Sequence, residues 1–179
     1  MNEAFKKELL QHIREIKDYP KKGILFKDIT TLINHHKLFK ELIDKLKKRY
    51  ENMPIDFVVG IEARGFILGS ALAYALGVGF VPIRKKGKLP SKIISQTYAL
   101  EYGTDSMEIH TDAFRGIKGA RVLLVDDLIA TGGTAIASLK LIKSLQAICA
   151  EACFLIGLKE LSGIKLIDEQ VKTFCVLEC

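Results

Sequence analysis

The sequence predicts an α/β fold in which helices flank a largely parallel, twisted sheet. Two observations carry this prediction. Short runs of Val, Ile, Leu and Phe, typical of strands buried on both faces, alternate with longer stretches whose apolar residues recur every three or four positions, as in amphipathic helices. Strand, loop, helix and strand in this order indicate βαβ units, and open parallel sheets bind ligands beyond the C-terminal ends of their strands.

The N-terminal half of the chain is expected to supply helices first and buried strands later. Helical spacing predicts two amphipathic helices at the start, and apolar runs on either side of an Ala- and Leu-rich helix predict two strands. In chain order these elements are residues 5–16, 38–50, 57–61, 65–76 and 79–84. After a basic stretch, residues 97–102 and 107–110 are expected to pair as a hairpin around Gly103.

The C-terminal half contains the strongest strand signal, a run of Val and Leu at residues 121–125. Asp126 and Asp127 follow it directly, and a helical pattern begins after the next pair of glycines. The helix and two further strands are expected at residues 134–145, 152–158 and 173–177.

Composition limits the class of protein. The chain has 179 residues, 49% of them hydrophobic and 27% charged, which excludes intrinsic disorder and allows one domain whose core needs no disulfide or structural metal. No apolar run approaches the ~20 residues of a membrane span, and the N-terminal residues lack the apolar stretch of a signal peptide. We therefore expect a cytoplasmic protein with no membrane partner.

Charge and cysteine content raise the possibilities of nucleic-acid binding and of a zinc site, and the sequence context disfavours both. Five basic residues without an acid lie between residues 84 and 92, which suits a polyanionic ligand. Nucleic acid is not expected, because no aromatic residues are interleaved there and no nucleic-acid module is recognised. The four cysteines form two pairs at a spacing of four, but neither pair has the Gly-containing turn of a zinc site, so reduced thiols are expected.

Residues 122–134, an apolar strand followed by two acids and a Gly-rich loop, form the motif on which function depends. Two glycines allow backbone N–H groups to converge on phosphate oxygens at the positive end of a helix, and carboxylates can hold a sugar diol and attract hydrated Mg²⁺. The motif therefore predicts a sugar-phosphate cradle made of Asp126, Asp127, Ala130, Thr131, Gly132, Gly133 and Thr134. The alternative is an acidic strand end before an ordinary helix N-cap. No P-loop or dinucleotide-binding fingerprint is present.

At these residues the sequence resembles the type I phosphoribosyltransferases, whose signature is an apolar strand, two acids and a Thr-Gly-Gly-Thr type loop. Four further segments narrow the resemblance to the adenine phosphoribosyltransferase family, namely residues 23–29, 60–66, 83–90 and 98–103. The resemblance covers about residues 19–163. It implies the type I phosphoribosyltransferase fold, with a small N-terminal hood at residues 1–34 and a core at residues 35–179.

The resemblance also implies how the substrates are bound. In the hood, the backbone of Leu25 would pair with the base edge and Phe26 would stack on adenine, while Lys27 stands where the family commonly has Arg. Pyrophosphate would be bound by two loops, the first of which commonly contains a non-proline cis peptide. These loops supply Glu62, Ala63, Arg64, Arg84, Lys85 and Lys88. Because the second loop reaches the neighbouring subunit in family dimers, a homodimer is implied.

A mobile loop at about residues 95–107 is implied to close over the substrates and exclude water. Within it, Glu101 matches the family's proposed general acid or base, which manages the proton of the purine. Late in the chain the sequence departs from the family, since residues 161–164 lack an arginine that is common there.

The implied reaction transfers a 5-phosphoribosyl group from Mg²⁺-bound phosphoribosyl pyrophosphate to adenine, giving AMP and pyrophosphate. Arg64 and the basic loop would stabilise the departing pyrophosphate. Two alternatives stay open: a 6-oxopurine or pyrimidine as the base, and a regulator that binds the same ligands without catalysis. Retention of Glu101 and the lack of a DNA-binding module in this sequence favour an enzyme.

Overall fold

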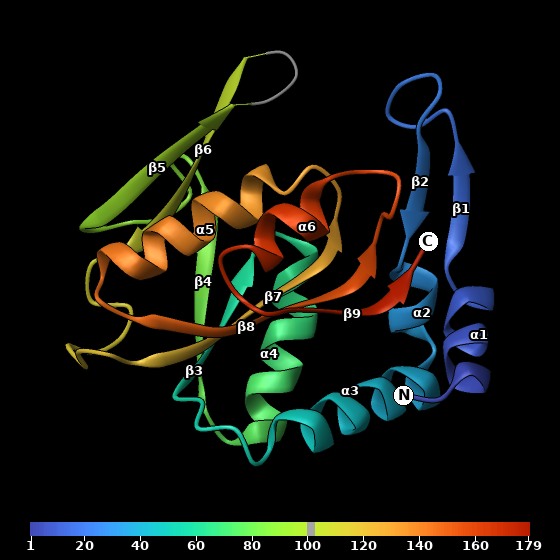
Figure 1. The fold of residues 1–179 in the computed structure, drawn as a ribbon, viewed down its shortest axis with the longest axis horizontal. Helices are drawn as coiled ribbons and strands as arrows, with labels where there is room; N and C mark the ends of the chain where they lie inside the picture. Colours follow the sequence, from blue (N-terminus) through green and yellow to red (C-terminus); the bar gives the residue numbers. More distant parts are fainter. Residues whose placement is uncertain (100–102) are drawn as a thin grey trace. The chain divides into compact units, whose positions relative to one another are not determined.

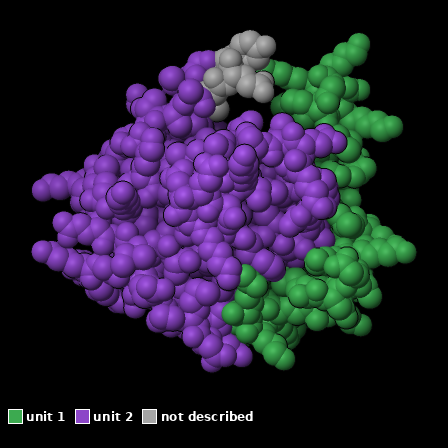
Figure 2. All heavy atoms as spheres, viewed as in Figure 1, with its two compact units in different colours: residues 1–49 green, residues 50–179 purple. Residues whose placement is uncertain are grey.

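The computed structural model describes residues 1–99 and 103–179. The chain divides into two compact units, residues 1–49 and residues 50–179 (Figure 2). In the described ranges no helix is both long enough and apolar enough to cross a membrane.

The second unit is built on a seven-stranded sheet with the order β5-β6-β4-β3-β7-β8-β9 (Figure 1). Five neighbouring strands, β4, β3, β7, β8 and β9, are parallel. The β5–β6 hairpin adds two strands at one edge, where β6 is antiparallel to β4. The strands are β3 (Phe57–Ile61), β4 (Gly79–Lys85), β5 (Ile93–Ala99), β6 (Thr104–His110), β7 (Arg121–Ile129), β8 (Ile148–Gly157) and β9 (Thr173–Glu178). The predicted α/β class with a largely parallel sheet is confirmed.

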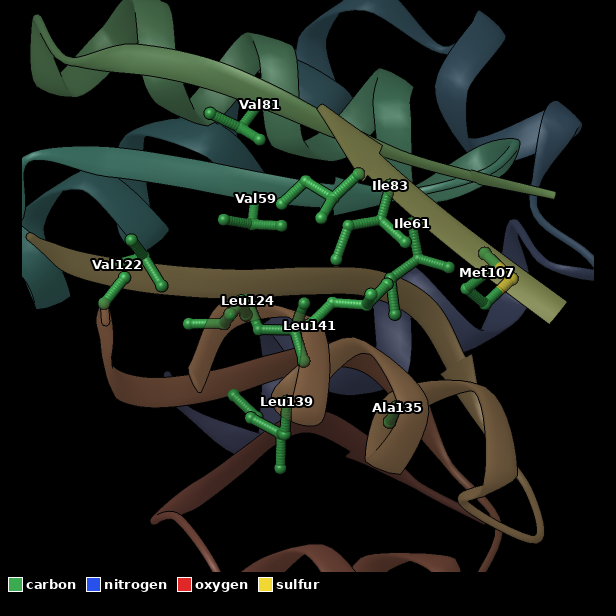
Figure 3. Packing of buried hydrophobic residues seen from close by; sticks show 14 of the residues in the cluster. Val59, Ile61, Val81, Ile83, Met107, Val122, Leu124, Ala135, Leu139 and Leu141 are labelled. Atoms are coloured by element: carbon green, nitrogen blue, oxygen red, sulfur yellow. The ribbon is translucent and has the colours of Figure 1, made fainter. Parts of the chain in front are cut away.

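Helices cover both faces of this sheet, as its doubly buried strands require. Val59 of β3 packs in one cluster with Leu139 of α5 (Gly133–Ser144) (Figure 3). Its neighbour Val58 faces α4 (Arg64–Leu76), where a Cβ added to Gly69 would lie 3.6 Å from Val58 Cγ1. Because successive strand residues point to opposite faces, α4 and α5 lie on opposite sides of β3. A short helix, α6 (Gly163–Asp168), precedes β9.

Several predicted bounds were wrong because pairing with distant strands decides where a strand ends. The strand predicted at residues 121–125 continues to Ile129, since Asp126, Leu128 and Ile129 pair with β8. The acids therefore lie within β7 rather than after it. The hairpin expected at residues 97–102 and 107–110 is present but longer, with Ile93 paired to His110 and Ala99 to Thr104. Residues 100–102, which connect these two strands in the sequence, lie outside the described residues.

The first unit consists of α1 (Glu3–Gln11), a hairpin of β1 (Arg14–Lys17) and β2 (Leu25–Asp28), α2 (Thr30–Asn34) and most of α3 (His36–Tyr50). The helix predicted over residues 5–16 was wrong beyond Gln11. Charged side chains pair across the hairpin instead, Arg14 with Asp28 and Lys27 with Glu15, and this cross-strand pairing outweighs the helical spacing of the apolar residues.

Candidate functional site

The predicted cradle residues converge at the C-terminal end of β7. The loop after this strand and the start of α5 line a hollow of about 210 Å³. A second hollow, of about 570 Å³, lies beside it and is lined by residues from both predicted phosphate-binding regions: Glu62, Ala63, Arg64, Lys85, Asp126, Asp127 and Thr134, together with Tyr98. Asp126 and Thr134 lie in both linings, so we call the two hollows together the cleft.

The cradle loop depends on close contact between glycines. Gly132 has a positive φ of 85°, and a Cβ added there would lie 3.1 Å from Gly163 Cα. Gly163 N donates a hydrogen bond of 3.1 Å to the carbonyl oxygen of Ala130. A Cβ on Gly163 would lie 2.2 Å from that same oxygen, so only glycine fits. Sequence reasoning missed Gly163, although its place in a Ser-Gly pair before a helix was a signal for a tight approach.

The two acids of β7 are buried to different extents and have different partners. Asp127 is 5% exposed, and its Oδ2 lies 2.6 Å from Nε of Arg64. Asp126 Oδ1 accepts a hydrogen bond of 2.8 Å from the backbone N–H of Asp127. Burial, and after it the negative charge of Asp127, raises the pKa of Asp126 well above its usual value. Asp126, Asp127 and Arg64 all line the larger hollow of the cleft.

Gly65 makes room for this pair. A Cβ added to Gly65 would lie 2.7 Å from Asp126 Oδ1 and 2.9 Å from the carbonyl oxygen of Val125. The start of α4 therefore lies directly against the end of β7, which places Arg64 beside Asp127.

The first predicted pyrophosphate loop holds the second one in place. The peptide bond between Glu62 and Ala63 is cis, as the resemblance implied. The Glu62 carboxylate accepts hydrogen bonds from Arg84 Nε and Nη2, each 3.2 Å, and from the backbone N–H of Lys85 at 3.0 Å. Burial acts to raise the pKa of Glu62, but these hydrogen bonds outweigh it and the pKa is lowered. Glu62 is therefore an ionised anchor for the basic loop.

The basic loop is a compact turn, and a residue that sequence reasoning missed helps to hold it. Gly87 N donates a hydrogen bond of 2.9 Å to Oε2 of Glu108, which is only 5% exposed. Arg84 Nη1 donates to the carbonyl oxygen of Lys88 at 2.8 Å. Of the three predicted basic residues, Lys85 therefore lines the cleft. Arg84 and the backbone of Lys88 contact each other within the turn. The signal for Glu108 was an acid between the apolar residues of a strand, which needs a partner when buried.

The three predicted adenine-binding residues lie on β2, in the first compact unit. The ring of Phe26 meets that of Tyr19 edge-on, with centroids 5.2 Å apart, and Leu25 is 43% exposed. The ammonium of Lys27 forms an ion pair with Glu15 on β1. Glu101 lies outside the described residues.

Comparisons with known proteins match this chain to phosphoribosyltransferases. Residues 28–177 match the family model for the phosphoribosyl transferase domain. The chain is 77% identical to adenine phosphoribosyltransferase of Helicobacter pylori (strain ATCC 700392 / 26695) over the full length of both, and 60% identical to that of Helicobacter hepaticus over 97% of each.

Solved structures show the same relationship. A crystal structure of adenine phosphoribosyltransferase from Thermoanaerobacter pseudethanolicus superposes with a TM-score of 0.92 at 49% identity, covering 97% of this chain and 99% of that one. The enzyme from Saccharomyces cerevisiae, complexed with an imino-altritol bisphosphate and adenine, gives a TM-score of 0.89 at 39% identity, covering 97% and 98%. The enzyme from Trypanosoma brucei, in complex with AMP, pyrophosphate and ribose-5-phosphate, gives 0.89 at 28% identity, covering 99% and 80%.

Proposed function

This chain belongs to the adenine phosphoribosyltransferase family, and from that premise we propose which of its residues perform the transfer. The protein is an enzyme of purine salvage: it moves the 5-phosphoribosyl group of phosphoribosyl pyrophosphate to adenine and forms AMP and pyrophosphate. One observation carries the assignment of roles, namely that the acids of β7 and the glycine cradle share a cleft with Arg64 and Lys85.

In the proposed assignment the loop from Ala130 to Thr134 holds the 5′-phosphate. Backbone N–H groups at the N-terminal end of α5 and the hydroxyls of Thr131 and Thr134 are suitable donors for phosphate oxygens. The carboxylates of Asp126 and Asp127 accept hydrogen bonds from the two ribose hydroxyls. The burial of Asp127 and the desolvation that raises the pKa of Asp126 support this role, because a carboxylate shielded from water interacts strongly with a donor that replaces water.

The pyrophosphate would lie toward Arg64, on the side of the cleft that the basic loop of residues 84–88 meets. The bond from C1′ of the ribose to the pyrophosphate oxygen breaks, a bond from C1′ to N9 of adenine forms, and N9 loses its proton. Positive charge next to the leaving oxygens stabilises the charge that develops on them. Mg²⁺ would enter as part of the substrate, and the hard oxygen donors of Asp126 and Asp127 suit such an ion.

Adenine would be bound by Phe26 through stacking and by the backbone of Leu25 through its polar edge. Lys27 differs from the arginine common in the family, and its ion pair with Glu15 indicates that it fixes the hairpin rather than contacting the base. Glu101 would accept the N9 proton.

The closing motion of residues 95–107 over the substrates stays a prediction. In this structure residues 95–99 and 104–107 lie in the paired strands β5 and β6. The cytoplasmic location stays a prediction as well.

A homodimer is part of the proposal, with the loop of residues 84–88 completing the neighbouring subunit's site. In its own chain this loop is held by hydrogen bonds to Glu62 and Glu108, and residues 85–88 are exposed, which suits a contact with a neighbouring subunit.

The test of the function is pyrophosphate release from Mg²⁺ and phosphoribosyl pyrophosphate, measured with adenine, hypoxanthine, guanine and uracil in separate reactions. We expect release with adenine alone and its loss in the Asp126→Ala, Asp127→Ala variant. Release with hypoxanthine, guanine or uracil would keep the cradle and overturn the base assignment. Binding of AMP without release from any base would instead point to a regulator.

A further inference from the structure

We propose that Tyr98 competes with the substrate for the phosphate cradle, because its hydroxyl takes the hydrogen bond that Thr134 would give to a bound 5′-phosphate. Tyr98 would then be an affinity-determining residue. The inference rests on the proposed function in one respect, the placement of the 5′-phosphate at Thr134.

The ring of Tyr98 lies against the start of α5. Tyr98 belongs to β5, is half-buried and lines the cleft together with Thr134. A Cβ added to Gly133, the first residue of α5, would lie 3.1 Å from Cδ2 of the Tyr98 ring. The β5–β6 hairpin is therefore packed onto the cradle through this side chain.

The hydroxyl of Thr134 is directed toward Tyr98. Thr134 Oγ1 lies 3.4 Å from Tyr98 Oη and donates to it. A hydroxyl has one proton to donate, and phosphate oxygens at neutral pH act mainly as acceptors. Thr134 can thus serve Tyr98 or the phosphate, but not both at once.

The neighbours of Tyr98 keep its oxygen available as an acceptor. Tyr98 Oη donates its own proton to Asp105 Oδ2, also at 3.4 Å, and the two residues are cross-strand partners. Asp105 is fixed in turn by the backbone N–H of Ser106 at 2.8 Å and lies 3.9 Å from Lys85 Nζ. Burial raises the pKa of Tyr98, so the phenol stays protonated at neutral pH. With its proton given to Asp105, the hydroxyl faces Thr134 as an acceptor.

The experiment is a double-mutant cycle on the dissociation constant of AMP, measured by calorimetry for the wild type, Tyr98→Phe, Thr134→Val and the double variant. Phenylalanine keeps the ring against Gly133 and removes only the hydroxyl. Because both contacts of the hydroxyl are long, we expect Tyr98→Phe to bind AMP about two- to five-fold more tightly. In the Thr134→Val background the same change should have no effect.

Two controls separate competition from a general change in the cleft. Adenosine lacks the phosphate, so its affinity should be the same for Tyr98→Phe and wild type. Tyr74→Phe removes a hydroxyl from a side chain that is 90% exposed and should leave AMP binding unchanged.

Weaker or unchanged AMP binding by Tyr98→Phe would overturn the inference, and so would equal tightening with Thr134→Val or with adenosine. Failure of the wild type to bind AMP would contradict the proposed function itself, and it would be seen before any variant is compared.

Discussion

Asp126, which we propose binds the ribose, is a residue whose ionised form opposes folding. Asp126 pairs with β8 within β7, and its neighbour Asp127 is a second carboxylic acid. Gly65 packs so closely against the Asp126 carboxyl that a larger residue would not fit at position 65. Burial and the charge of Asp127 both favour its protonated form. A carboxyl group whose pKa is raised on folding lowers the stability of the protein when it is ionised. The ionised carboxylate is nevertheless the form that accepts hydrogen bonds from both hydroxyls of a sugar diol.

We therefore expect Asp126→Asn to stabilise the protein by on the order of 1 kcal/mol near neutral pH, while AMP formation falls at least about tenfold. The gain should shrink as the pH falls, because the wild-type carboxyl then becomes protonated in the folded state and no longer carries the cost. Urea unfolding at about pH 7.5 and about pH 5 measures it. Asp112→Asn, at an exposed position, is the control. A loss of stability at the higher pH would contradict this account.

Asp28 has the opposite behaviour. The backbone N–H of Thr30, then the Thr30 side chain and then Arg14 lower the pKa of Asp28 to about 2. Its contribution to stability is therefore full above the unfolded pKa near 3.8 and is lost as the pH falls through about 2.

Asp28→Asn should accordingly cost about 1–2 kcal/mol of unfolding free energy at neutral pH and almost nothing near pH 2. Unfolding measured across this pH range tests the prediction. The exposed Asp44, which forms an ion pair with Lys40 on the same helix, offers a matched change that should cost less than about 0.5 kcal/mol. A loss of unfolding free energy in Asp28→Asn that does not vary with pH would contradict the proposed role of the Asp28 carboxylate.

At the scale of single residues, sequence patterns predicted those groups whose chemistry is carried by the motif itself. Asp126, Gly132 and Thr134 meet in one cleft as expected. Gly163 and Glu108 were missed, because each acts on a segment more than twenty residues away and only the folded chain shows which backbone groups they meet.

At the scale of elements, burial decided what could be predicted. The strand at residues 57–61 matches β3, since a strand covered on both faces is a continuous apolar run. The β1–β2 hairpin was missed because β1 is largely exposed and β2 is only partly buried, and because its ion pairs join positions 12 to 14 residues apart. The end of β7 was misplaced because β8 supplies its partners.

The start of β8 contains a buried polar contact that serves stability. Tyr50 Oη donates a hydrogen bond of 2.7 Å to Glu151 Oε1, and both residues are 0% exposed. Lys172 Nζ lies 3.6 Å from the other carboxylate oxygen. Glu151 follows an irregularity in the β7–β8 register, at the end of the strand opposite to the cradle.

We expect Tyr50→Phe to lower the unfolding free energy by about 1–3 kcal/mol, because it removes a partner from a buried carboxylate. The KM values for both substrates should stay within about twofold, since the contact lies away from the cleft. Thermal unfolding and steady-state kinetics measure the two effects, and Tyr74→Phe is the matched control. A large change in KM with little change in stability would contradict this division of roles.

At the scale of the whole molecule, the homodimer can be tested by mixing inactive protomers. An Asp126→Ala, Asp127→Ala protomer lacks a working cradle, and a Lys85→Ala, Lys88→Ala protomer lacks the basic side chains of the loop. If the loop completes the neighbouring site, refolding them together should recover up to about a quarter of wild-type activity, because half of the dimers are mixed and each has one intact site. No gain over the separate variants would show that the loop acts within its own chain, whose cleft Lys85 also lines.

The measurement that tests the central claim most directly is calorimetric titration of ribose 5-phosphate and of pyrophosphate, each alone, into two variants. Thr131→Ala with Thr134→Ala should weaken ribose 5-phosphate by at least about tenfold and leave pyrophosphate within about twofold, and Lys85→Ala should do the reverse. That pattern would assign the two ends of the substrate to the two sides of the cleft. Equal losses for both ligands in both variants, or an unchanged affinity of the threonine variant for ribose 5-phosphate, would contradict the account.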